Sequence, residues 1–145
     1  MTGSARITDR YLAGTRLRLR RVEGPAGAVF KLAQKVRLAE AEPERVKITN
    51  LYLDRDEYLR LAGLPGSELL KTRRWLELSS HRIAVDDFEG RHGGLVLAEV
   101  ELGDGDEALP LPAFAARDVT HDDRYSGGAL AWASYDTITS LIGIG

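Results

Sequence analysis

Charged residues occupy every second position in short stretches of this chain, and the residues between them are mostly apolar. The stretches are Arg16–Arg20, Lys31–Lys35, Lys71–Arg73, Val85–Phe88 and Ala98–Leu102. Successive side chains of a β-strand point to opposite faces, so each stretch predicts a strand with one apolar and one charged face. Because some of these strands are cationic and others anionic, a barrel lined by them would bind a polyanion together with its metal ion.

The length and composition predict one domain in a reducing compartment. A chain of 145 residues can bury about 68–70% of its unfolded surface without disulfides. The sequence has no cysteine, so a bound metal would need oxygen or imidazole ligands. Together with the lack of a recognisable signal peptide, this favours a cytoplasmic protein. No apolar run approaches the roughly 20 residues of a membrane-spanning helix, so we expect no membrane partner.

The net charge of -2 hides an uneven distribution along the chain. Between Met1 and Arg21 there are six arginines and a single acid, Asp9, whereas residues 86–123 are strongly acidic. A nucleic-acid-binding domain is more often basic overall, with a continuous basic face, so we expect no nucleic-acid partner. The opposite charges are expected to meet inside one fold.

Seven stretches have the composition of strands and are separated by turn signals such as Gly24-Pro25-Ala26-Gly27. They span residues 7–12, 15–22, 28–35, 46–53, 68–78, 82–88 and 95–102. The stretch 39–45 contains Pro43 and predicts a loop, and residues 103–106 predict a turn. A further short strand is predicted at residues 118–121.

One short helix has clear boundaries in the sequence. Asp54 is a favourable N-cap, and Glu57 stands three residues later, as in a capping box. Gly63 is expected to end this helix.

A second helix is predicted from about Ser126 to Leu141, with Trp132 and Tyr135 on its buried side. Trp75 shares a strand face with Lys71 and Arg73, so it could stack on a nucleobase or thiamine ring, or simply pack at the mouth of a tunnel.

The cationic stretches leave two interpretations open. Arg16, Arg18 and Arg20 fall on one face, and planar guanidinium groups bind phosphate oxygens in a bidentate manner. A half-exposed antiparallel strand, however, often carries a solvated charged face that is paired with acids on a neighbouring strand. The other cations considered for phosphate binding are Lys35, Lys71 and Arg73.

The acidic stretches also leave two interpretations open. Glu99 and Glu101 share a face, about 7 Å apart, and two such carboxylates can hold Mg²⁺ or Mn²⁺. The alternative is an outward-facing acidic pair matched to arginines across the ladder. Asp86 and Asp87 point to opposite faces, so only one of them can join such a site.

The order of these stretches is more specific than any one of them. Arg-x-Arg is followed by a lysine at a strand end, Lys-Thr-Arg, an aspartate two residues before phenylalanine, Glu-x-Glu, and Asp-Val-Thr-His-Asp-Asp-Arg-Tyr. From Ile7 to about Ala131, this order resembles the CYTH family of triphosphate tunnel metalloenzymes. The segments that carry the resemblance are Ile7–Leu12, Leu70–Arg73, Val85–Gly90, Gly94–Glu101 and Asp118–Tyr125.

The resemblance implies an α+β fold in which about eight antiparallel strands form a β-barrel tunnel with short flanking helices. Inward side chains would bind a linear triphosphate and a divalent ion, Mg²⁺ or Mn²⁺. By position in the family pattern, Lys71 and Arg73 would be catalytic, while Glu99, Glu101 and Asp86 would hold the metal. The phosphate-binding residues would be Arg16, Arg18, Arg20, Lys35, Lys71, Arg73 and Arg124, with either Arg16 and Arg18 or Arg18 and Arg20 as the principal arginine pair.

Three functions are compatible with this resemblance. The first is metal-dependent hydrolysis of inorganic triphosphate or of an organic triphosphate, which would make the protein a triphosphatase. The second is non-catalytic binding of triphosphate, polyphosphate or a nucleotide. The third is adenylyl cyclase activity, which no feature of this sequence favours over the family background.

Two departures from the family pattern bear on these functions. The family's Glu-x-Glu-x-Lys strand should precede Ile7, yet residues 1–6 contain no acid. We therefore expect residues 1–145 to be a single CYTH-like domain that is N-terminally truncated and lacks the first strand. The stretch 46–53 also lacks the second Glu-x-Glu of many relatives. A barrel without one strand exposes an unpaired edge, which predicts a homo-oligomer.

Overall fold

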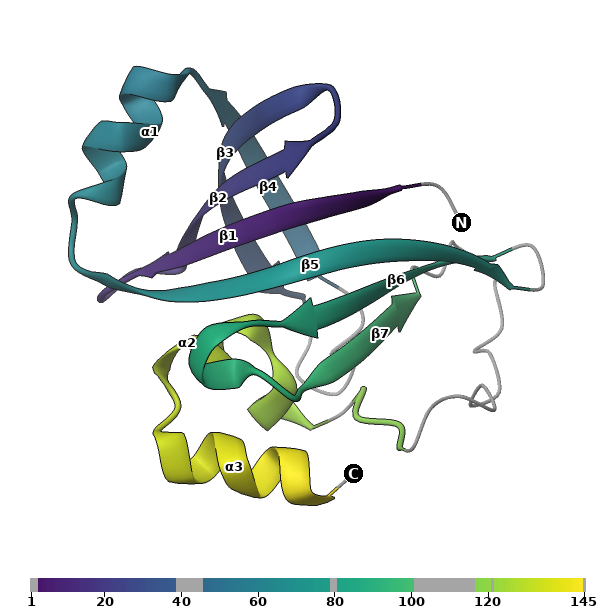
Figure 1. Cartoon of the computed structure of the whole chain (residues 1–145). Helices are drawn as coiled ribbons and strands as arrows, with labels where there is room; N and C mark the ends of the chain where they lie inside the picture. The colour runs from purple at the N-terminus through teal and green to yellow at the C-terminus, as the bar shows by residue number, and fades with distance from the viewer. Residues whose placement is uncertain (1–2, 39–45, 79–80, 101–116, 121, 145) are drawn as a thin grey trace.

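The seven strands predicted between residues 7 and 102 all form, and they pair into one antiparallel sheet that curls into a half-barrel (Figure 1). The computed structural model describes residues 3–38, 46–78, 81–100, 117–120 and 122–144. Within the sheet the strand order is β4-β3-β2-β1-β5-β6-β7. The bounds are β1 Ser4–Leu12, β2 Leu17–Gly24, β3 Gly27–Arg37, β4 Val46–Leu53, β5 Gly66–Leu78, β6 His81–Phe88 and β7 Val96–Val100.

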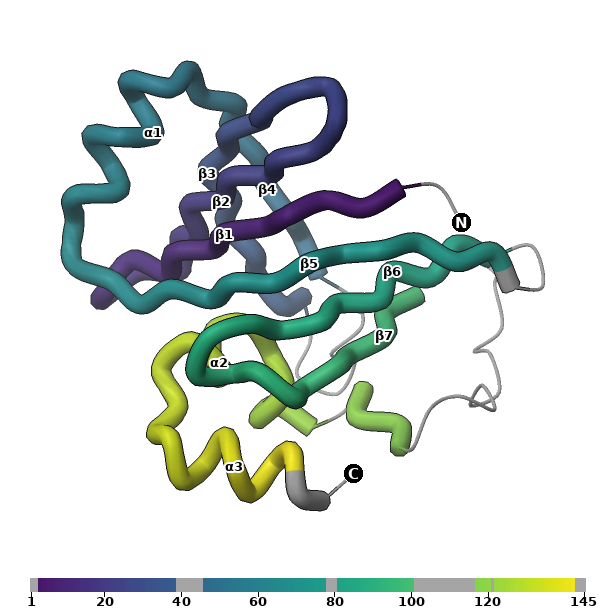
Figure 2. The backbone as a smooth tube through the Cα atoms, in the orientation of Figure 1, coloured from purple at the N-terminus to yellow at the C-terminus, as the bar shows by residue number. Residues whose placement is uncertain are grey.

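β1 lies in the middle of the sheet, between the β2–β3–β4 meander and the β5–β6–β7 meander (Figure 2). β4 and β7 are the two edges among the described strands, and the sheet curves between them. The α+β fold with an antiparallel tunnel-like sheet is therefore confirmed.

Helix α1 (Arg55–Ala62) covers the convex face of the first meander, and its start is the predicted capping box. The Asp54 side chain accepts from the Glu57 amide at 2.8 Å, and the Glu57 side chain accepts from the Asp54 amide at 2.9 Å. Tyr58 packs on Phe30, with ring centroids 4.8 Å apart, next to the buried Leu19. The cap and this small core fix α1 on the outside of the sheet.

Two further helices, α2 (Gly127–Trp132) and α3 (Tyr135–Ile144), pack at one end of the half-barrel. Their core contains Leu130 and Leu141, which pack with Leu69 and Phe88 from the sheet. Arg91 and the buried His92 bind backbone carbonyls at the end of α2, with His92 Nε2 2.7 Å from the Leu130 oxygen. This end of the concave face is therefore covered by apolar packing. None of the described helices is long and apolar enough to cross a membrane.

The prediction of a single helix over residues 126–141 is wrong, because the chain turns between α2 and α3. Ala133 adopts an extended conformation, and the Ser134 hydroxyl accepts from the Thr137 amide at 3.1 Å as the cap of a new helix. The turn reorients the flanking aromatic residues. Trp132 is 55% and Tyr135 70% exposed, so neither lies on a buried side.

The strand predicted at residues 118–121 is also not observed in its described part, residues 118–120. The Asp118 carboxylate accepts from both the amide and the hydroxyl of Thr120, at 3.0 and 2.6 Å, and thereby bends the chain. The predicted loop at 39–45 and the predicted turn at 103–106 lie outside the described residues.

Candidate functional site

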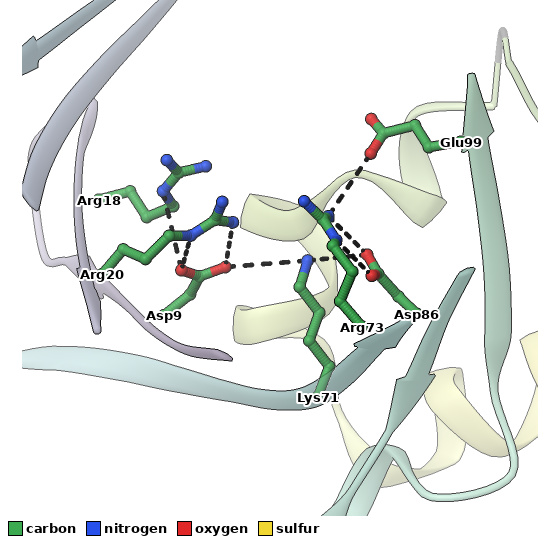
Figure 3. Close-up of polar contacts among 7 residues, drawn as sticks. All are labelled: Asp9, Arg18, Arg20, Lys71, Arg73, Asp86 and Glu99. Carbon is green, nitrogen blue, oxygen red and sulfur yellow. Dashed lines mark hydrogen bonds and ion pairs between the residues drawn. The ribbon is translucent and has the colours of Figure 1, made fainter. Parts of the chain in front are cut away.

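The antiparallel register places the charged side chains of neighbouring strands on one face of the sheet. Asp9 of β1 is opposite Arg20 of β2, and Arg73 of β5 is opposite Asp86 of β6. Residues directly opposite each other point to the same side of a sheet, and here that side is the concave one. Figure 3 shows the resulting cluster, which we call the charged row. It consists of Arg18, Arg20, Asp9, Lys71, Asp86, Arg73 and Glu99.

Asp9 is the anionic centre of the β1–β2 part of the charged row. Its side chain is fully buried, and Arg20 donates to both of its oxygens, at 2.6 and 2.7 Å. Arg18 Nε and Lys71 Nζ approach the same carboxylate at 3.8 and 3.9 Å. One carboxylate therefore serves three cations from two neighbouring strands.

Asp86 has the same role in the β5–β6 part of the charged row. Arg73 donates to its two oxygens at 2.7 and 2.8 Å, and Lys71 Nζ lies 3.0 Å from it. Arg73 also reaches toward Glu99 of β7, 3.7 Å away. Lys71 links the two halves, so charges alternate in sign along the row from β2 to β7 (Figure 3).

The pKa values of these groups reflect a balance between burial and pairing. Burial opposes the charged form of Asp9, but the hydrogen bond and charge of Arg20, with Arg18 and Lys71, outweigh it and lower its pKa. Asp86 also has a lowered pKa, since Arg73 and Lys71 overcome its desolvation. Burial lowers the pKa of Lys71 despite its two carboxylates, and burial also raises the pKa of Tyr11, on the same face, to about 12.

Among the described residues of this face, cations remain in excess. The charged row contains four cations against three carboxylates, and Lys31, opposite Arg20 in β3, adds another. Burial and the charges of Arg20 and Arg18 lower the pKa of Lys31. The Arg18 Nε is buried and has no hydrogen-bond partner in the described part of the chain. The Arg21 Nε on the convex face lacks a partner as well, so what favours an anionic ligand at Arg18 is its place among the other cations of the concave face.

The structure brings most of the predicted site residues together. Arg18, Arg20, Lys71, Arg73, Asp86 and Glu99 all belong to the charged row. Arg18 and Arg20, rather than Arg16 and Arg18, form the inward pair, because Arg16 lies exposed in the bend before β2. These two arginines face inward and are paired with an acid of the neighbouring strand, whereas phosphate binding by them stays a prediction.

Lys35 and Arg124 stand outside this cluster, as Arg16 does. Lys35 shares the concave face, opposite Ile48 of β4, and is exposed. Arg124 is exposed in the short helix η2 (Asp123–Tyr125), where it pairs with Asp122 at 2.6 Å. Glu101 lies outside the described residues.

The described residues do not form a metal centre of their own. Among them there is no group of three or more acidic, histidine or cysteine side chains that could hold an ion. Both Asp86 oxygens accept from Arg73, whereas the Glu99 side chain is 70% exposed and, among the described residues, contacts only Arg73 at long distance. Among the predicted metal ligands that the structure describes, Glu99 is thus the one whose oxygens are available to an ion. Such an ion would need to bring other ligands with it.

Sequence reasoning missed Asp9 as a site residue. The available signal was its position two residues from both Ile7 and Tyr11, which places a carboxylate on an otherwise apolar strand face. It was also the single acid among six arginines in residues 1–21. Lys31 was noted in a charged stretch but was not assigned to phosphate.

Comparisons with known proteins agree on the architecture. A solved structure of the inorganic triphosphatase NE1496 matches this chain with a TM-score of 0.60 at 23% identity, over 90% of this chain and 84% of that one. This chain shares the fold of that protein. A second structure of NE1496, titled as a hypothetical protein, gives a TM-score of 0.61 at 24% identity, over 90% and 86% of the two chains.

A curated protein matches a shorter part of the sequence. An inorganic triphosphatase of Acetivibrio thermocellus is 41% identical over 51 residues, which cover 35% of this chain and 33% of that protein. The match thus spans about a third of the length of each protein. No protein-family model matches the chain.

Proposed function

We propose that this chain is a CYTH-type triphosphate tunnel protein that binds a triphosphate on its concave face and hydrolyses it with a divalent ion. The observation that carries the proposal is the excess of cations around a buried Arg18 nitrogen that lacks an acceptor. The likeness in fold to an inorganic triphosphatase and the segment of sequence identity to another support the same ligand.

The residues divide into two groups in this proposal. Arg18, Lys31 and Lys35 would contact phosphate oxygens first, because none of them is held in a short ion pair by a described carboxylate. Lys71 and Arg73, held in place by Asp86, would stabilise the charge that develops on the transferred phosphoryl group. Positioning by fixed cations is the main contribution that a protein makes to this reaction.

The divalent ion, Mg²⁺ or Mn²⁺, would enter with the triphosphate, whose oxygens would supply most of its ligands. Glu99 would add a carboxylate oxygen, and Glu101 is a second candidate from its place in the sequence. When bound, such an ion neutralises phosphate charge and so eases attack by water.

The test is phosphate release from inorganic triphosphate by the 145-residue chain with Mg²⁺ or Mn²⁺. We expect release by the wild type and a large loss in Glu99→Ala. The matched control is Glu68→Ala, because Glu68 lies on the convex face in an ion pair with Arg10 at 3.4 Å. Equal activity of the two variants would contradict the role of Glu99.

Non-catalytic binding of triphosphate is the second candidate function. It is favoured by the lack of a preformed metal centre among the described residues. This candidate predicts that triphosphate raises the melting temperature while no phosphate is released with any divalent ion. If triphosphate neither binds nor is hydrolysed, both candidates are wrong.

Assembly and location are further parts of the proposal. β4 is an edge strand whose Ile48 and Leu51 are more than half exposed, at 52% and 59%. Exposed edge strands with apolar side chains favour pairing with another copy, so we propose a homo-oligomer through an open edge. Light scattering across a range of protein concentrations tests this. A cytoplasmic location is proposed from the lack of cysteine.

A further inference from the structure

The end of the concave face that α2 covers carries a row of three opposed side chains. Arg18 of β2 is opposite Tyr11 of β1, and Tyr11 is opposite Ser67 of β5. The Ser67 hydroxyl donates to the Ala131 carbonyl of α2, and the Tyr11 ring packs against the core that contains Leu130 of α2. Helix α2 (Figure 1) thus rests on two members of this row, and Arg18 is the third.

The contact between Tyr11 and α2 leaves no space for a side chain at Gly127. A Cβ atom at this position would collide with the Tyr11 hydroxyl oxygen and would lie 3.1 Å from Cζ of the ring. A Cβ atom at Gly128 would lie 3.8 Å from the nearest atom of the ring, which is ordinary van der Waals contact. Glycine is less favourable than alanine in a helix. The position of the Tyr11 hydroxyl therefore requires glycine at residue 127 but not at residue 128.

On the other side of Tyr11, the Arg18 side chain is not fixed by its carboxylate. Asp9 lies 3.8 Å from Arg18 Nε, whereas it accepts from Arg20 at 2.6 and 2.7 Å. Opposite Arg18 on β3 is Ala33, whose side chain is a single methyl group. Directly opposed side chains have Cβ atoms about 4.5–5.5 Å apart, so the Tyr11 ring is the large neighbour of Arg18 on the flanking strands. A shift of this ring would therefore reach Arg18.

The Tyr11 hydroxyl is neutral although it lies close to several charges. Burial raises the pKa of Tyr11 to about 12, and the charge of Asp9 acts in the same direction, against the charges of Arg18 and Arg20. The phenol therefore keeps its proton at neutral pH. A neutral neighbour restrains Arg18 without neutralising its charge, which stays available to an anion.

We infer that Tyr11 is a positioning residue whose ring, seated on Gly127 of α2, holds the Arg18 guanidinium in place for an anionic ligand. This inference rests on the proposed function and adds a positioning residue to it. Packing at the start of α2 and anion binding on the concave face are then coupled. A change in the seat of Tyr11 changes anion affinity although no charged residue is altered.

The test measures the Kd of inorganic triphosphate for the full chain by calorimetry, in the wild type and in Gly127→Ala. We expect Gly127→Ala to raise the Kd about fivefold, because the added methyl group displaces the Tyr11 hydroxyl. The matched control is Gly128→Ala, which adds the same methyl group one residue later and should keep the Kd within about twofold. Melting temperatures of both variants show that they are folded during the titration.

Two double variants show whether the effect passes through Tyr11 and Arg18. Tyr11→Phe alone should raise the Kd about threefold, since the ring loses part of its seat, and it removes the oxygen that the added methyl group would displace. Gly127→Ala should therefore change the Kd less than about twofold when it is added to Tyr11→Phe. It should also change the Kd less than about twofold when it is added to Arg18→Met, which has no guanidinium to position.

The outcomes separate this inference from the proposed function. If the folded Gly127→Ala variant binds triphosphate like the wild type, or if it raises the Kd equally in all three backgrounds, the inference is wrong and the proposed function stands. If Gly127→Ala does not fold, Tyr11→Leu takes its place and should raise the Kd about fivefold in the wild type but less than about twofold in Arg18→Met. Equal effects of Tyr11→Leu in these two backgrounds likewise overturn the inference. If the wild type does not bind triphosphate, the proposed function fails, and the inference with it.

Discussion

The centre of the concave face and its β3–β4 edge carry charges in different ways. In the centre, each buried cation has a carboxylate partner, and Asp9 and Asp86 each serve more than one of them. At the edge, Lys35 is exposed, and β4 contributes Tyr52, which is 67% exposed, opposite Lys31. No described carboxylate lies within ion-pair distance of Lys31 or Lys35.

This difference indicates a division of labour within one face. A buried ion pair loses much stability when one partner is removed, whereas an exposed charge contributes little to folding. The central charges therefore maintain the fold and hold one another in place. The edge charges, together with Arg18, are free to respond to a ligand. The following predictions test this division, from the largest expected effect to the smallest.

Removal of Asp9 should have the largest effect on stability. Asp9→Ala leaves Arg20 buried without its carboxylate, so we expect a loss of about 3–5 kcal/mol in the free energy of unfolding. Urea denaturation measures this. Asp87→Ala, at an exposed position on the convex face of β6, should change stability by only about 0.5 kcal/mol. Similar losses in the two variants would contradict a structural centre at Asp9.

Replacement of Arg18 should act mainly on ligand binding. Arg18→Met keeps the apolar stem and removes a guanidinium from the cation-rich concave face, so we expect triphosphate affinity to fall roughly ten- to hundredfold. The melting temperature should change little, because repulsion from Arg20 is relieved at the same time. Titration calorimetry measures the affinity. Arg21→Met, on the convex face, should bind triphosphate like the wild type; a matching loss there would contradict a specific site.

Acid should destabilise the centre through Asp9. Its pKa is lowered in the folded protein, so its contribution is fully present above the ordinary carboxyl pKa of about 4 and is lost as the pH falls through the folded value. Urea midpoints should therefore stay level from pH 7 to about pH 5 and then decrease. Asp9→Asn should show a shallower decrease, and an unchanged slope in that variant would show that other groups govern acid unfolding.

Replacement of Lys35 at the edge should have the smallest effect. Lys35→Ala removes an exposed side chain without a short ion pair to a described residue, so we expect a stability change within about 0.5 kcal/mol. Triphosphate affinity should fall only a few-fold and should depend less on salt than in the wild type. A loss of several kcal/mol in the free energy of unfolding would show that charges at the edge stabilise the fold as those in the centre do.

The sequence predicted the sheet well because alternation is a local signal. Each strand between Ile7 and Val100 needs one apolar face. Side chains two residues apart lie on the same face, so the spacing of apolar residues identifies that face directly from the sequence. The capping box at Asp54 was equally local. The two helices after Ser126 were harder to predict, since the turn at Ala133 depends on a serine cap within a sequence that is otherwise compatible with a continuous helix.

The candidate site was only partly predictable. The inward cations and Asp86 followed from alternation and from the resemblance to a family, but the partner of each charge depends on the register between strands. Asp9 meets Arg20 because β1 and β2 pair at that position, and no local pattern states this.

The sharing of carboxylates along the charged row has a consequence for how such a sequence can change over generations. Asp9 contacts Arg20, Arg18 and Lys71. The effect of a mutation at any one of these four positions therefore depends on which residues occupy the other three. Loss of Asp9 alone would be selected against, whereas its loss together with Arg20 would leave no buried unpaired charge between them. We therefore expect relatives to inherit or abandon an acid at position 9 and an arginine at position 20 as a pair.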